Sequence, residues 1–293
     1  MTISELLEQP GTAIRVGLVI QGGGMRGSYS AGACAYLAST KHADSISYAI
    51  GTSAGGINAT YFAARHTSFY EAYTEFLSNN RFITVKDKKP YMDLDYLVDI
   101  ILKKAVKLDM RKLRASATKV EISVTNIFTQ EVEYRDPCKE KDVYELFRAT
   151  SAMPIFYGKS VLLDDTPYID GGVKDSVPIS RASSKNCTHI IVILCKEPDE
   201  EKESSTRMVK FALRRLHPDW PEELWSTMGS EGDSVYDTLR NIPANKYGVP
   251  KLLVLKPSDP TKLVSRFTRS HKDLKACAEM GRQDMQRFLK STL

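Results

Sequence analysis

The chain has 293 residues, of which 42% are hydrophobic and 26% charged, and its formal net charge is +5. This length allows one large α/β core or two small domains, and the composition is typical of a soluble globular protein. No apolar run reaches the roughly 18 residues that a membrane-spanning helix requires, and the first 15 residues do not resemble a secretory signal.

The cysteines predict neither a disulfide framework nor a zinc site. They are odd in number and scattered without close pairs, at Cys34, Cys138, Cys187, Cys195 and Cys277. We therefore expect a reducing, cytoplasmic compartment. No cluster of Asp, His or Cys indicates a metal, and we expect no metal or other cofactor.

The first half of the chain alternates short apolar runs with small-residue segments. Val16–Ile20 reads as a strand, Ser28–Ala38 as a helix, Ile46–Ile50 as a second strand and Ala54–Arg65 as a second helix. Such an order predicts a parallel sheet covered by helices. Ligands bind at the carboxyl ends of the strands in sheets of this kind, and both strands end at glycine-rich turns.

The rest of the chain continues the mixed pattern. A hairpin is expected around Thr129-Gln130, and residues 207–244 predict two or three helices that either belong to the core or cap the site. The expected helices are Phe69–Leu77, Leu94–Val106 and Val143–Thr150, and the expected strands are Val120–Ile127, Glu131–Tyr134, Val161–Leu163, Tyr168–Ile169, Ile190–Leu194 and Leu252–Leu255.

No linker or internal repeat divides the chain. We predict a catalytic core over 14–200 and, packed on the same domain, a helical extension over 201–293 that contains a last strand and an amphipathic helix over 271–290. Residues 251–293 hold ten Lys or Arg against four Asp or Glu. A solvated helix face accounts for this surplus, and peripheral attraction to an anionic membrane at its inner face is the functional alternative. Nucleic acid is not expected, because no recognition motif is present.

The sharpest motif is Gly51-Thr52-Ser53-Ala54-Gly55, which lies between a predicted strand and a predicted helix. This G-x-S-x-G pattern in that context predicts a tight turn that lifts the serine side chain above the sheet. The following helix directs its free N–H groups and positive dipole end toward the same point. A serine that merely caps the helix is the alternative.

A second glycine-rich turn, Gly22-Gly23-Gly24-Met25-Arg26-Gly27, also joins a strand to a helix. Its exposed backbone N–H groups could stabilise an oxyanion or bind a phosphate. The turn also matches the G-x-G-x-x-G dinucleotide fingerprint. A dinucleotide site needs an acidic residue at the end of the second strand, whereas Asp44 precedes this strand.

A third motif, Asp170-Gly171-Gly172, follows a short predicted strand. Together with the glycine-rich turn, the G-x-S-x-G turn and Ala149–Pro154, it makes the chain from about Val16 to Ile193 resemble the bacterial branch of the patatin-like phospholipases. The resemblance implies a three-layer α/β/α sandwich with a mainly parallel central sheet. It also implies hydrolysis of fatty-acyl esters by a Ser–Asp dyad without a histidine.

By motif position, Ser53 would be the nucleophile and Asp170 its base, and Gly22, Gly23 and Gly24 would form the oxyanion hole with Arg26 close by. The expected activity is hydrolysis of phospholipids or lysophospholipids through an acyl-enzyme. An acyltransferase would use the same residues. A non-catalytic lipid-binding module and a Ser–His–Asp triad stay open as alternatives, the triad using His189, His217 or His271.

Overall fold

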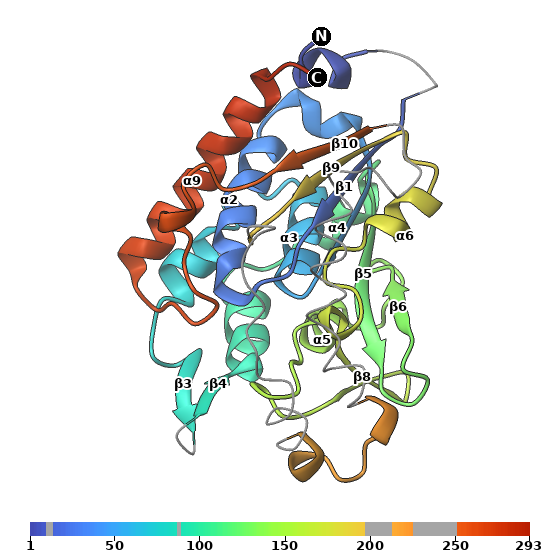
Figure 1. Ribbon diagram of the computed structural model, residues 1–293, viewed down its shortest axis with the longest axis vertical. Coiled ribbons are helices and arrows are strands. Elements are labelled where there is room, and N and C mark those ends of the chain that lie inside the picture. Colours follow the sequence, from blue (N-terminus) through green and yellow to red (C-terminus); the bar gives the residue numbers. More distant parts are fainter. Residues whose placement is uncertain (10–13, 87–88, 197–212, 225–250) are drawn as a thin grey trace.

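The computed structural model describes residues 1–9, 14–86, 89–196, 213–224 and 251–293 (Figure 1). Its centre is a sheet whose strands follow the order β10-β9-β1-β2-β5-β8-β7, with β6 paired to β5. The first five strands of this order run parallel to their neighbours. They are β10 (Lys251–Leu255), β9 (His189–Ile193), β1 (Val16–Ile20), β2 (Ile46–Thr52) and β5 (Lys119–Asn126).

The other edge of the sheet is antiparallel. β8 (Thr166–Asp170) runs against β5, β7 (Val161–Leu163) runs against β8, and β6 (Val132–Arg135) forms a hairpin with β5. This pairing places Asp170 opposite Val124. The last residue of β8 therefore lies beside the carboxyl-terminal half of β5.

Helices cover both faces of the sheet, because the strand side chains alternate between two apolar clusters. Leu18 and Ile191 contribute to the cluster that includes α2 (Gly27–Ala38), α3 (Ala54–Ala63) and α9 (His271–Lys290). Val19 and Ile190 contribute to the opposite cluster, which includes α6 (Ile179–Ser184). The arrangement confirms the predicted three-layer α/β/α fold with a mainly parallel sheet (Figure 1).

Helix α9 packs closely along α2, and Figure 1 shows the two helices side by side. A side chain on Gly32 would overlap the carbonyl of Ala278, and one on Gly281 would overlap the carbonyl of Tyr29. The Tyr29 hydroxyl also donates a 3.1 Å hydrogen bond to the buried Asp284. Residues 251–293 thus add one strand and one helix to the same layers as the first half of the chain, and the apolar side of α9 is buried.

Most predicted elements are present, some with shifted ends. The expected helices over Phe69–Leu77 and Leu94–Val106 contain the wider π-helices η3 (Ala72–Phe76) and η4 (Tyr96–Ala105). Helix α5 (Val143–Thr150) has the predicted bounds. Besides short 3-10 turns and α6, the described elements that were not predicted are α1 (Ile3–Leu7), α4 (Met110–Ala115), β3 (Ile83–Lys86) and β4 (Lys89–Met92).

The predicted helices of 207–244 fall mostly outside the described residues. In the described part, Leu213 and Leu224 pack against Ile127, Ile169 and Val173. Among the described helices, none has the length and apolar character that crossing a bilayer would require.

Candidate active site

Ser53 lies in a strained turn between β2 and α3. Its φ of 55° and ψ of −129° form a conformation that side-chain-bearing residues rarely adopt. The turn is closely packed on both sides, because a Cβ on Gly51 would overlap Gly55 and a Cβ on Gly55 would overlap the carbonyl of Ile20. Only small residues can therefore flank the serine, and the turn holds Ser53 at the N-terminus of α3, where the helix dipole favours developing negative charge.

The backbone of this turn is held by buried hydroxyl groups. The Ser53 N–H donates a 2.9 Å hydrogen bond to Thr150 Oγ1, and that hydroxyl donates to the Ser123 carbonyl at 2.8 Å. The preceding residue, Thr52, donates through its own hydroxyl to the Asp175 carbonyl at 2.8 Å and lies 2.5 Å from Ser123 Oγ. Four segments of the chain thereby fix the position of the serine.

Asp170 ends β8 and is only 2% exposed. Its Oδ1 accepts a 2.8 Å hydrogen bond from the Gly172 N–H, whereas Oδ2 accepts none within the described chain. Burial raises the pKa of the carboxyl to about 6, and the Gly172 N–H, the nearby Ser53 hydroxyl and the charge of Arg266 limit the rise. The Ser53 side chain is thus close enough to affect the carboxyl, although no fully formed hydrogen bond joins the two.

The segment Ala149–Pro154 passes beside both residues. Thr150 binds the Ser53 N–H, and the Ala152 carbonyl accepts the Asp170 N–H at 3.1 Å. The sequence identified this segment only through its resemblance. The hydrogen bonds show its physical role, which is to hold the serine turn and the end of β8 in a fixed relation.

The glycine-rich turn lies directly against the serine. A Cβ on Gly22 would stand 3.2 Å from Ser53 Cβ and 2.8 Å from the Thr52 carbonyl, so only glycine fits. The Gly22 N–H already donates to the Ser176 carbonyl at 3.3 Å. Within the described chain, the N–H groups of Gly23 and Gly24 donate to no acceptor, which leaves them available to an oxyanion.

Arg26, the remaining predicted site residue, donates through Nε to the Val264 carbonyl at 3.2 Å. Its guanidinium is therefore tied to the C-terminal part of the chain. The structure brings Ser53, Asp170 and the three glycines together at the carboxyl ends of β1 and β2, and it places Arg26 one turn further along the same loop.

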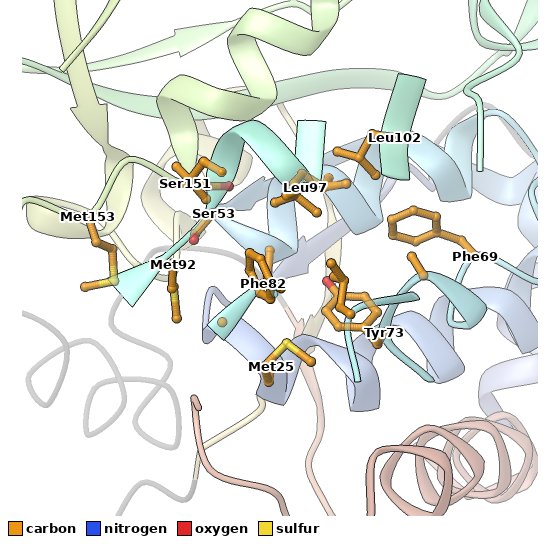
Figure 2. A pocket seen from close by; sticks show the side chains of 16 residues that line it. Met25, Ser53, Phe69, Tyr73, Phe82, Met92, Leu97, Leu102, Ser151 and Met153 are labelled. Carbon is orange, nitrogen blue, oxygen red and sulfur yellow. The ribbon is translucent and has the colours of Figure 1, made fainter. Parts of the chain in front are cut away.

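An apolar pocket opens beside Ser53. It encloses about 540 Å³ of empty space, counting the part open to solvent, and apart from the serine its lining is almost entirely apolar or aromatic. Figure 2 shows Met92 and Met153 on one side of Ser53, and Phe69, Tyr73 and Leu102 at the far end of the other side. The apolar lining matches the polarity of a fatty-acyl chain.

The histidines lie elsewhere. His189 begins β9, at the opposite end of the sheet from Ser53, and His271 binds the Thr74 carbonyl through Nδ1 at 2.7 Å. His217 contacts the Pro154 carbonyl at 3.2 Å and stacks on Trp220. In the described chain, no hydrogen bond joins a histidine to Ser53 or Asp170. The residues that the structure describes also contain no group of three or more potential metal ligands.

Some residues of the site were not predicted. Thr150, which holds the Ser53 N–H, lay within the resembling segment but carried no separate signal. The aromatic and aliphatic lining of the pocket is indistinguishable in sequence from an ordinary core. Arg266 lies far from the motifs in sequence, yet its charge lowers the pKa of Asp170.

A comparison with protein-family models identifies one family. The family model described as patatin-like phospholipase matches residues 18–183. The uncharacterized protein YjjU of Escherichia coli K12 is 28% identical over 194 residues, which cover 63% of this chain and 52% of YjjU. The chain therefore spans about half the length of that relative. The crystal structure of VipD from Legionella pneumophila aligns with 95% of this chain and 67% of its own, at 10% identity and a TM-score of 0.47.

Proposed function

Because the chain belongs to the patatin-like phospholipase family, a family of lipid hydrolases, we propose that it hydrolyses fatty-acyl esters of phospholipids or lysophospholipids. Ser53 is the nucleophile of this proposal and Asp170 its base. The observation that carries it is a strained serine that lines an apolar pocket beside a buried carboxylate, whose Oδ2 has no hydrogen-bond partner in the described chain. These are the parts that an acyl transfer to serine requires.

In the first half of the reaction, Ser53 Oγ attacks the ester carbonyl and its proton moves to Asp170 Oδ2. The raised pKa of Asp170, about 6, makes this carboxylate a better base than an exposed aspartate. The N–H groups of Gly23 and Gly24 and the N-terminus of α3 stabilise the oxyanion. The intermediate then expels the alcohol, which takes the proton from Asp170 and leaves an acyl group on Ser53.

In the second half, water attacks the acyl-enzyme and transfers its proton to Asp170. The tetrahedral intermediate releases the fatty acid, and Ser53 Oγ recovers its proton from Asp170. Each proton that Asp170 accepts is therefore returned within the same half-reaction. The apolar pocket holds the acyl chain throughout, so the chain stays beside the serine between the two steps.

A fluorophosphonate probe tests the nucleophile directly, because it reacts with an activated serine whatever the natural substrate is. Mass spectrometry should find one adduct, on Ser53, and Ser53→Ala should remove both the adduct and the hydrolysis of short p-nitrophenyl esters. Ser151→Ala is the matched control, because Ser151 lines the same pocket and its loss should leave Ser53 labelled. Hydrolysis by folded Ser53→Ala above a few per cent of the parent rate, with contaminating esterase excluded, rejects the assignment.

We also propose that the basic residues of 251–293 attract the protein to anionic membranes. Lys272, Lys275 and Lys290 are exposed, whereas the apolar side of α9 is buried against α2, so the attraction would be electrostatic rather than by helix insertion. Co-sedimentation should be stronger with anionic than with neutral vesicles and should weaken with salt. Equal binding to both kinds of vesicle at low salt rejects this contact.

A further inference from the structure

A segment far outside the matched family region lies directly on the glycine-rich turn. The Met25 N–H donates to the Arg266 carbonyl at 3.2 Å, and Arg26 Nε donates to the Val264 carbonyl at 3.2 Å. A Cβ on Gly24 would stand 3.0 Å from that same Arg266 carbonyl. The backbone of 264–266 is therefore fixed against the loop that we assign to the oxyanion hole.

The side chain of Arg266 starts from this contact. Its Cβ would lie 3.6 Å from a Cβ on Gly24. Burial raises the pKa values of Asp170 and of the Cys195 thiol behind Gly23, and the charge of Arg266 offsets a small part of each rise. Gly24 lines the apolar pocket, so the Arg266 side chain starts beside the site. Its position is thus set by the loop that also positions the oxyanion.

Among the described residues, no carboxylate forms an ion pair with the guanidinium of Arg266. The residue is exposed, and its side chain makes no ion pair or hydrogen bond within the described chain. Several other arginines are neutralised by carboxylates. Arg148 pairs with Asp95, Asp99 and Glu145, and Arg181 pairs with Glu121. Arg266 thus carries a positive charge beside the glycine-rich turn that no ion pair of the described chain neutralises.

We propose that Arg266 binds the phosphate of a phospholipid substrate whose acyl ester lies next to Ser53. This inference rests on the proposed function. The phosphate of a glycerophospholipid is only a few bonds from its acyl esters. The guanidinium of Arg266, whose side chain starts beside Gly24, can therefore reach this phosphate. A guanidinium binds phosphate oxygens through two parallel hydrogen bonds, which the exposed setting of Arg266 permits. Arg266 is thus a specificity residue that favours phospholipids over neutral acylglycerols.

The test compares two monomeric esters with equal acyl chains, dihexanoylphosphatidylcholine and dihexanoylglycerol, both below their critical micelle concentrations. Arg266→Ala should lower the ratio of kcat/KM for the phospholipid to kcat/KM for the neutral ester by about 10- to 100-fold, mainly through KM. Assays at about pH 8.5 keep Asp170, with its pKa of about 6, ionised in every variant. Arg266→Lys keeps the charge without the paired donors, so its ratio should fall less than that of Arg266→Ala.

Arg269→Ala is the matched control, because Arg269 is an exposed arginine of the same segment and no hydrogen bond or ion pair of the described chain joins it to the glycine-rich turn. Its ratio should stay that of the parent. A ratio within about twofold of the parent in folded Arg266→Ala overturns the inference alone, and so does an equal fall in Arg269→Ala. If the parent protein hydrolyses neither ester and Ser53 is not labelled by the fluorophosphonate, the proposed function and this inference both fail.

Discussion

The backbone N–H of Ser53 donates a 2.9 Å hydrogen bond to Thr150 Oγ1, which ties the serine turn to the last residue of α5. Two residues later, the Ala152 carbonyl accepts the N–H of Asp170. One short segment therefore positions both residues of the proposed dyad. Arg148, in the last turn of the same helix, pairs with Asp95 and Asp99 and so anchors the segment to the neighbouring η4 region.

Asp170→Asn should reduce kcat/KM for short esters by at least about 100-fold, because asparagine is nearly isosteric but cannot accept the serine proton. The amide oxygen can keep the hydrogen bond from Gly172, so the fold should be preserved. His189→Gln, His217→Gln and His271→Gln, made one at a time, should retain most activity. If one of these folded histidine variants lost activity as completely as Asp170→Asn, a triad would replace the dyad, because the aspartate of a triad is needed as well as its histidine.

The pH dependence of kcat/KM should show one ionisation on the acidic side, with an apparent pKa near 6. Burial raises the pKa of Asp170 to about 6, and only the ionised carboxylate acts as a base. Activity should therefore fall as the pH drops through 6. Initial rates with a p-nitrophenyl ester, read at one common pH after quenching, would measure the profile. An acidic limb near pH 4 would indicate an ordinary, solvated aspartate.

The same carboxyl should make stability depend on pH. Asp170 keeps its proton to about pH 6 in the folded protein but loses it near pH 4 when unfolded, so its contribution to stability is present at low pH and lost between pH 4 and 6. Asp170→Asn removes this loss. The difference in the free energy of unfolding, variant minus parent, should therefore be roughly 1–3 kcal/mol larger at pH 8 than at pH 4. Urea unfolding at the two pH values measures the difference, and an equal offset at both would contradict the buried charge.

A side chain at Gly23 should disturb the oxyanion hole for a specific reason. Its φ of 177° suits any residue, but a Cβ there would lie 2.6 Å from Cys195 Sγ. Gly23→Ala should therefore displace the loop and lower kcat, and loss of one oxyanion donor commonly costs about 10²–10³-fold. Cys195→Ala removes the obstructing sulfur, so the double variant should recover part of the lost kcat. If the double variant recovered no kcat, the loss in Gly23→Ala would not come from the contact with Cys195 Sγ.

The far end of the apolar pocket should set the preferred acyl length. Leu102 is fully buried and lies at the end away from Ser53 (Figure 2). Leu102→Phe should fill this end and lower kcat/KM for long-chain p-nitrophenyl esters more than for butyrate. Leu102→Met, which nearly conserves volume, is the control and should keep the parent preference. Equal losses for all chain lengths in Leu102→Phe would show that acyl chains do not reach Leu102.

The parts of the molecule that were predicted from the sequence are those set by residues close together along the chain. The strand before Gly22, the turn around Ser53 and the helix over 271–290 follow from local patterns of apolar, small and charged residues. The hairpin β3–β4 and the helices α1, α4 and α6 are short and lack such a pattern. Thr150 and Arg266 gain their roles from residues about a hundred or more positions away, and a single sequence does not record such contacts.

The crossing of α2 and α9 has a consequence for the order of folding. Tyr29 and Asp284, which meet across it, are 255 residues apart in sequence. Helix α2 begins directly after the glycine-rich turn, so this loop is braced by a contact of very long range. Long-range contacts form late because the intervening chain must first be brought together. We therefore expect β1 and β2 to pair before α9 docks, and the glycine-rich turn to reach its final packing only after α9 docks.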